Sequence, residues 1–121
     1  MHMTTPKSSV SGQLLYKYRL DIIGGKYPPG SQFPTVRALA YEEQVNPNTM
    51  QKVLTLLEQD GLLTSQGTRG RFVTEDQAVI SEVRLLLQTE YLKAAREQAV
   101  RLGITKQQFM QFLEESEEHN A

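Results

Sequence analysis

The sequence predicts a mainly α-helical protein with one small β-hairpin. Apolar residues recur at helical spacing in five segments, two short β-prone runs bracket a glycine-rich turn, and Gly or Pro separates most of these segments. The 121 residues fit one domain, or one small domain plus an appendage. Hydrophobic residues make up only 39% of the chain, so we expect a small core and some apolar surface left for a partner subunit.

The first helix is predicted to begin at Ser11. Residues 1–10 before it are polar, show no periodicity and are expected to be disordered. From Ser11 onward, apolar residues share one broad face until Gly24 and Gly25 end the pattern. The next segment, KYPPG, has the composition of a turn.

A second, short helix is predicted after Phe33. This residue is expected to be extended, because a residue that precedes a proline is disfavoured in the α region. Thr35 then suits the N-cap position, and the helical pattern fades near Gln44. The second helix is therefore short and closely followed by a third.

The third helix has an unusual start in the segment VNPNTMQKVLTLLEQDGLL, residues 45–63. Its apolar residues have helical spacing, but the NPNT that precedes them is poor in a helix interior. Asn46 can cap the helix, and Pro47 at the first helical position loses no hydrogen bond, because its N–H would have been unsatisfied anyway. Gly61 suits the left-handed position just after the helix end.

A β-hairpin is predicted next, with strands in 62–65 and 71–74 and a tip, QGTRG, between them. Three helices followed by a hairpin form the winged helix-turn-helix layout, in which the third helix enters the DNA major groove by its N-terminal end. The polar side chains at that end are therefore candidates for base and phosphate contacts: Asn48, Thr49, Gln51 and Lys52.

Two helices are predicted in the rest of the chain. A long helix covers residues 75–102 and ends at Gly103. The segment 105–108, TKQQ, fits a capping box that opens a last helix. Residues 114–121 are predicted to form an acidic, frayed tail.

Three segments carry a resemblance to a known family: GGKYPPGSQFPTVRALA (24–40), VNPNTMQKVLTLLEQDGLL (45–63) and GTRGRFV (67–73). In this order they are specific, although each alone would be a weak signal. The chain resembles the GntR family of bacterial transcription regulators, and within it the YtrA-like subfamily. The resemblance implies a winged helix-turn-helix DNA-binding domain in residues 11–74. It also implies a pair of dimerisation helices in residues 75–121.

The resemblance further implies a homodimeric repressor that binds a palindromic operator in double-stranded DNA. The operator is expected in its own operon, which in this subfamily often encodes an ABC transporter. Carried over residue by residue, the implied DNA contacts are Thr35, Arg37, Asn46, Asn48, Thr49, Gln51, Lys52, Arg69, Gly70 and Arg71.

The chain departs from the family pattern in two places. Many relatives carry arginine in the recognition segment, where this chain has Pro47 or Asn48, Gln51 and Lys52, so their base preference is not transferred. The glycines of the wing are spaced one residue wider than usual. This spacing leaves open whether Arg69 or Arg71 reaches the minor groove.

Charge separates the two parts of the chain. Residues 1–74 hold eight Lys/Arg and five Asp/Glu, a net charge of +3, whereas residues 75–121 hold five and nine, a net charge of −4. Only the first part therefore suits a polyanion. In the second part, apolar residues on the long helix and the last helix are predicted to form the dimer interface: Val83, Leu87, Tyr91, Ala94, Leu102, Phe109, Phe112 and Leu113.

Other function classes find less support. Winged helices also serve as protein-interaction modules, and a charge of only +3 leaves that alternative open. No nucleophile–base pair, phosphate-binding glycine loop or metal-ligand spacing is present, so we expect no enzyme activity, no cofactor and no metal site. Without cysteine, an apolar membrane span or a signal pattern, the chain is expected to be cytoplasmic. Whether a small-molecule effector exists stays open.

Overall fold

The computed structural model describes residues 9–120, with side chains placed up to Glu115. The chain divides into two compact units, one that ends at Leu87 and one that begins at Gln88. We call them the N-terminal unit and the C-terminal unit. The predicted disorder of residues 1–10 falls mostly outside the described residues, and Ser9 already caps the first helix through a bond from the Gly12 N–H at 3.1 Å.

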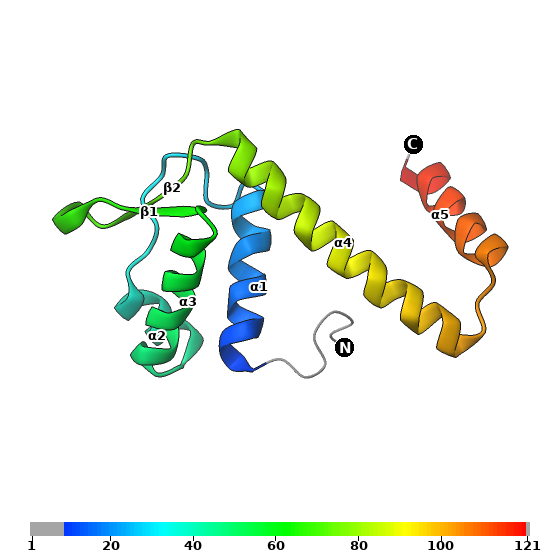
Figure 1. Cartoon of the computed structure of the whole chain (residues 1–121), viewed down its shortest axis with the longest axis horizontal. Coiled ribbons are helices and arrows are strands. Elements are labelled where there is room, and N and C mark those ends of the chain that lie inside the picture. Colours follow the sequence, from blue (N-terminus) through cyan, green and yellow to red (C-terminus); the bar gives the residue numbers. More distant parts are fainter. Residues whose placement is uncertain (1–8, 121) are drawn as a thin grey trace. The chain divides into compact units, whose positions relative to one another are not determined.

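The N-terminal unit begins with three helices (Figure 1): α1 (Val10–Ile23), α2 (Val36–Glu43) and α3 (Pro47–Gln59). The caps form as predicted. The Ala38 N–H donates to Thr35 Oγ1 at 3.1 Å, and the Asn48 N–H donates to Asn46 Oδ1 at 2.7 Å. These bonds satisfy N–H groups at the helix N-termini and thereby fix where α2 and α3 begin.

The predicted hairpin consists of β1 (Leu63–Ser65) and β2 (Arg71–Val73), which are antiparallel with Leu63 opposite Val73. A short 3-10 turn, η1 (Gly67–Arg69), forms the tip, where the sequence predicted only a turn. We refer to residues 63–73 as the wing. The mainly α-helical fold class with one small hairpin is thus confirmed.

One hydrophobic core holds this unit together. Tyr18 and Ile22 of α1 pack with fully buried side chains of α3, and Phe33 contacts the Tyr18 ring edge-on at a centroid distance of 5.8 Å. The buried residues of α3 are those predicted from helical spacing: Met50, Val53, Leu54 and Leu57. Because α3 is anchored on this face, its opposite face and its N-terminal end remain exposed.

Helix α4 (Gln77–Leu102) begins two residues later than predicted, because Asp76 accepts a bond from the Ala78 N–H at 2.9 Å and acts as its cap. Its first turns belong to the core of the N-terminal unit. Val83 and Leu87, which were predicted to form the dimer interface, are only 7% and 6% exposed and pack in this core. That prediction was wrong for these two residues, because their own chain covers them.

The C-terminal unit contains the rest of α4 and α5 (Lys106–Asn120). Gly103 has φ +72° where α4 ends. The predicted capping box forms: the Gln108 N–H donates to Thr105 Oγ1 at 3.1 Å, and the Thr105 N–H donates to Gln108 Oε1 at 2.8 Å. Residues 114–120 continue α5, so the predicted frayed tail is wrong over this range; Ala121 lies outside the described residues.

Candidate nucleic-acid interface

The N-terminal end of α3 presents a row of polar side chains. Asn48, Gln51 and Lys52 are exposed, and Thr49 is half-buried. The Gln51 amide donates to Thr55 Oγ1 at 3.2 Å, one turn further along the helix. Asn48 gives only its backbone N–H to the cap, so its side-chain amide is available to a ligand. Amide side chains at this position can form paired hydrogen bonds with a base edge.

Helix α2 adds a second polar end beside α3. Thr35 is exposed, and its hydroxyl is occupied by the cap described above. Arg37 lies in the first turn of α2 and is exposed. The short connection between the helices, Gln44 to Asn46, allows α2 to pack on α3 with both N-terminal ends accessible. Gln44 makes this connection in the left-handed region, at φ +59°.

The wing contains two arginines in different environments. Arg71 is half-buried, and its Nε donates to Glu58 Oε1 of α3 at 3.0 Å. Arg69 is exposed at the tip, with its guanidinium 5.5 Å from the centre of the Phe72 ring. Gly70, between them, has φ +103°, a conformation that favours glycine. The Arg69 guanidinium is therefore more available to a ligand than the Arg71 guanidinium, a difference that the sequence alone did not show.

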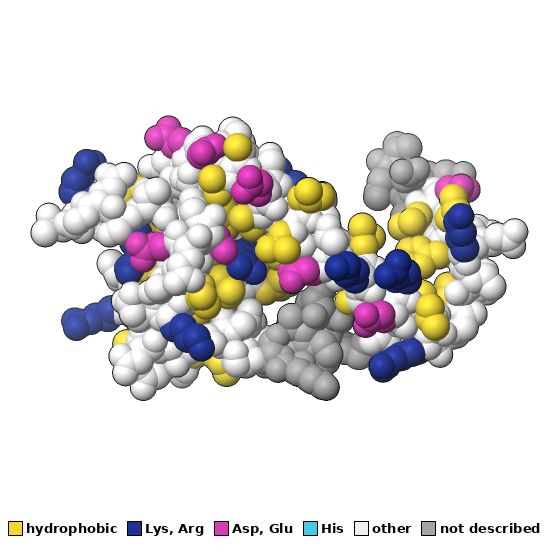
Figure 2. All heavy atoms as spheres, viewed as in Figure 1, with side chains coloured by type: hydrophobic (Ala, Val, Ile, Leu, Met, Phe, Trp, Pro, Cys, Tyr) yellow, Lys and Arg dark blue, Asp and Glu magenta, His cyan; other side chains and the backbone are white. Residues whose placement is uncertain are grey.

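Ion pairing within the chain singles out three cations. Between residues 9 and 74, four of the seven Lys/Arg face a carboxylate: Lys17 with Glu43, Arg19 with Asp60, Lys26 with Asp21, and Arg71 with Glu58. The other three, which form no ion pair with the described residues, lie on α2, α3 and the wing: Arg37, Lys52 and Arg69. Figure 2 shows Lys and Arg side chains projecting on the side where α2 and the wing lie.

The strongest electrostatic cluster is structural. Glu43 accepts hydrogen bonds from Lys17 Nζ and from the Tyr18 hydroxyl, the latter at 3.3 Å, and so ties α2 to α1. The hydrogen bond between Lys17 and Glu43 lowers the pKa of Glu43 and raises the pKa of Lys17. Burial, followed by the nearby Glu43 charge, raises the pKa of Tyr18. All three groups keep their ordinary charge at neutral pH, so the cluster fixes the helix pair and offers no acid or base.

The C-terminal unit exposes a different kind of surface. Of the six remaining residues predicted to form the dimer interface, Tyr91, Leu102, Phe112 and Leu113 are exposed, whereas Ala94 and Phe109 are half-buried. The exposed fractions of Leu102 and Phe112 reach 72% and 66%. Large apolar side chains left this open are characteristic of a surface that another molecule covers.

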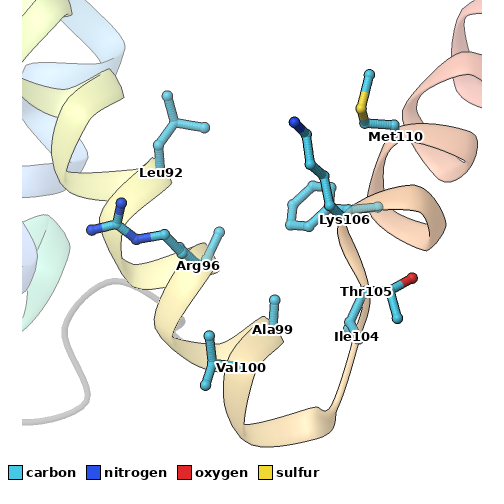
Figure 3. Close-up of a pocket in the computed structure, with 10 residues that line it drawn as sticks. Leu92, Arg96, Ala99, Val100, Ile104, Thr105, Lys106 and Met110 are labelled. Atoms are coloured by element: carbon cyan, nitrogen blue, oxygen red, sulfur yellow. The ribbon is translucent and has the colours of Figure 1, made fainter.

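A groove lies between the two helices of the C-terminal unit (Figure 3), with a volume of about 450 Å³. Leu92 and Ala99 of α4 face Met110 of α5 across it, and Arg96 and Lys106 lie beside these apolar residues. A second groove of about 470 Å³ is lined by Tyr91, Phe109, Phe112 and other residues of the same helices. Both grooves are mainly apolar and fit a helix or an apolar ligand better than a polyanion.

The described residues contain no helix with both the length and the apolar composition of a membrane span. No cluster of three or more His, Asp or Glu side chains among them could hold a metal ion.

Sequence reasoning missed two residues of this interface. Glu58 was not expected to hold Arg71, and Gln32 was not considered, although its Nε2 donates to the Arg69 carbonyl at 2.9 Å. Both contacts join segments that only the tertiary fold brings together. The composition around Gln32 gave no signal for it.

Comparison with known proteins identifies a family for the first part of the chain and relatives that cover most of its length. The model for bacterial regulatory proteins of the gntR family matches residues 13–73. The HTH-type transcriptional repressor YtrA of Bacillus subtilis is 26% identical over 113 residues, which cover 91% of this chain and 87% of that protein.

Two solved structures share the fold. A GntR family transcriptional regulator from Listeria monocytogenes superimposes with a TM-score of 0.80 at 23% identity, covering 91% of this chain and 96% of that one. BusR of S. agalactiae, solved in complex with its busAB-promotor DNA, gives a TM-score of 0.57 at 19% identity, covering 92% of this chain and 54% of that one. At these identities the likeness establishes the winged-helix fold.

Proposed function

The chain belongs to the GntR family of bacterial regulatory proteins and resembles its YtrA-type members, and from this premise we propose that it is a homodimeric transcriptional repressor. Its target is double-stranded DNA with a palindromic operator, and repression follows from occupying a promoter. The observation that carries the proposal is the position of the three cations without a carboxylate partner, Arg37, Lys52 and Arg69, on the elements that enter or flank DNA in this fold.

In the proposed complex, α3 lies in the major groove. Asn48 and Gln51 read base edges, because an amide offers a donor and an acceptor side by side. Arg37 and Lys52 bind phosphates and set the register, while Thr35 and Thr49 support these contacts. The Asn46 cap is kept in the complex and orients the end of α3.

The wing contributes Arg69 to the adjacent minor groove, with Gly70 allowing close approach of the backbone. We assign the wing contact to Arg69 in preference to Arg71. Releasing Arg71 would leave the half-buried Glu58 carboxylate without its partner, which opposes a DNA contact by Arg71. Arg69 has no carboxylate to leave.

A second copy of the chain covers the apolar surface of the C-terminal unit. Tyr91, Leu102, Phe112 and Leu113, with the half-buried Ala94 and Phe109, form this proposed interface. Two recognition helices related by a two-fold axis would then meet successive major grooves about 34–36 Å apart.

The regulated operon is proposed to be the protein's own, and by resemblance to the subfamily to include an ABC transporter. The Bacillus subtilis relative is named a repressor, and BusR was solved on promoter DNA; both support a promoter target for this chain.

The proposal is tested by titrating the protein against a fluorescent duplex from the region upstream of its own gene and against an unrelated duplex. We expect the upstream duplex to bind at least ~10³-fold more tightly at physiological salt, with log K falling linearly against log salt. Sedimentation equilibrium on the same samples should give a dimer. Equal and weak binding to both duplexes would favour a protein-interaction module, and a monomer that binds DNA tightly would contradict the dimer.

A further inference from the structure

The wing has a third strand-like partner. Residues 30–33 run along the outer edge of β2: the Phe33 N–H donates to the Arg71 carbonyl at 2.8 Å, and the Val73 N–H donates to the Ser31 carbonyl at 2.9 Å. Gln32 and Phe72 form an antiparallel bridge between these bonds. The outer edge of β2 is therefore occupied, and Gln32 lies beside the start of the wing tip.

The Gln32 side chain extends this pairing to the tip itself. Its Nε2 donates to the carbonyl oxygen of Arg69 at 2.9 Å. A Cβ at Gly70 would lie 2.9 Å from the same Nε2 atom, which is closer than side-chain carbons approach such atoms. The φ of +103° at Gly70 favours glycine, and a larger residue there would also displace the Gln32 amide from its present position.

This bond holds the backbone of Arg69, the wing arginine that forms no ion pair with the described residues. The Arg71 guanidinium is already fixed by Glu58, whereas the Arg69 guanidinium lies over the Phe72 ring. A hydrogen bond to the Arg69 carbonyl restricts the direction in which its side chain leaves the turn. Without it, the tip would lose more conformational freedom on binding, and that loss weakens affinity.

We propose that Gln32 is a positioning residue that pre-orders Arg69 for its contact with DNA. The proposal rests on the DNA-binding function proposed above and concerns the wing alone. Gln32 is exposed, and its segment pairs with β2 through backbone bonds, so replacing the side chain should leave the fold intact. Its role can therefore be separated from a role in stability.

The test is a double-mutant cycle of Gln32→Met and Arg69→Ala. The probe is the tightest-binding duplex that the wild-type protein selects from a random-sequence pool. Methionine keeps the length of glutamine but removes the donor, so Gln32→Met should weaken binding about fivefold per protomer, roughly the entropic cost of ordering one more residue of the tip on binding. In the Arg69→Ala background the same change should have less than about a twofold effect, because the side chain that Gln32 positions is gone.

Gln66→Met is the matched control, since this wing glutamine makes no side-chain cap bond at the tip and should bind as the wild type does. Urea midpoints of all variants should agree. Equal losses from Gln32→Met in both backgrounds, or no loss in either, would overturn the positioning role. If the wild-type protein selects no duplex from the pool, the proposed DNA-binding function fails and the inference about Gln32 fails with it.

Discussion

In the unit formed by residues 9–87, most large apolar side chains are covered by the chain itself, whereas residues 88–115 leave nearly all of theirs exposed. Of the eight Lys and Arg side chains in residues 9–87, four form no ion pair with the described residues: Arg37, Lys52, Arg69, and Arg84, whose guanidinium donates to the Ile23 carbonyl at 3.2 Å. Each unit therefore exposes the kind of side chain that its proposed partner would bind. The first offers cations to a polyanion, and the second offers apolar surface to another copy of the chain.

The largest effect should come from a substitution in the buried core of residues 9–87. Leu54 is fully buried at the centre of the α3 packing face. Leu54→Ala removes buried methyl groups and leaves a cavity, so the free energy of unfolding should fall by about 3 kcal/mol. Urea denaturation followed by circular dichroism measures this loss. A change below about 1 kcal/mol would mean that the core is less self-sufficient than its burial indicates.

Substitutions of exposed apolar residues in the C-terminal unit should change dimerisation instead of folding stability. Phe112→Glu places a charge in the proposed dimer interface and should weaken dimerisation at least ~100-fold, as expected for an aromatic anchor. Sedimentation equilibrium gives the dissociation constant. Gln107→Glu, also exposed on α5, adds the same charge and should leave association nearly unchanged. Equal effects of the two variants would indicate general repulsion and contradict a specific apolar interface.

Two neighbouring asparagines separate capping from base reading. Asn46→Ala removes the cap of α3 and should lower the free energy of unfolding by about 1 kcal/mol. Asn48→Ala should leave stability within about 0.5 kcal/mol but reduce the preference for the operator over mismatched duplexes by about 1–3 kcal/mol. Thermal unfolding and competitive binding measure the two quantities. A loss of sequence preference only in Asn46→Ala would reverse these assignments.

The smallest effect concerns the ion pair between Lys17 of α1 and Glu43 of α2. The Lys17 bond lowers the pKa of Glu43 below its ordinary value of 4.5, so the paired carboxylate stabilises the fold at higher pH. This contribution is present above pH 4.5 and is lost as the pH falls through the lower folded-state pKa. Glu43→Gln should therefore cost less than about 1 kcal/mol at neutral pH and nothing near pH 2. Urea unfolding at both pH values tests this sign.

Local chemistry explains which structural predictions succeeded. The caps at Thr35, Asn46 and Thr105 depend on side chains within three residues of the bonded N–H, and all three were readable from sequence. The frayed tail failed because charged residues such as Glu are good helix formers, so a polar composition does not end a helix.

Tertiary contacts explain which residue roles could not be predicted from the sequence. The apolar stripe of α4 is continuous in sequence, yet Val83 and Leu87 pack in the core while Leu102 is exposed. Periodicity identifies an apolar face but not the molecule that covers it. The Arg71–Glu58 pair and the Gln32 bond likewise join distant elements, so the wing arginines could be ranked only once the fold placed these partners.

The central claim is that Arg37, Lys52 and Arg69, the cations of residues 9–74 that form no ion pair with the described residues, contact DNA, and the salt dependence of binding tests it most directly. We would compare the wild-type protein with the triple variant Arg37→Ala, Lys52→Ala, Arg69→Ala, and with Lys26→Ala as a control from the paired set. If each cation in both protomers neutralises one phosphate, the slope of log K against log salt should become shallower by about 5 in the triple variant. The control should keep the wild-type slope. An unchanged slope in the triple variant would contradict the claim.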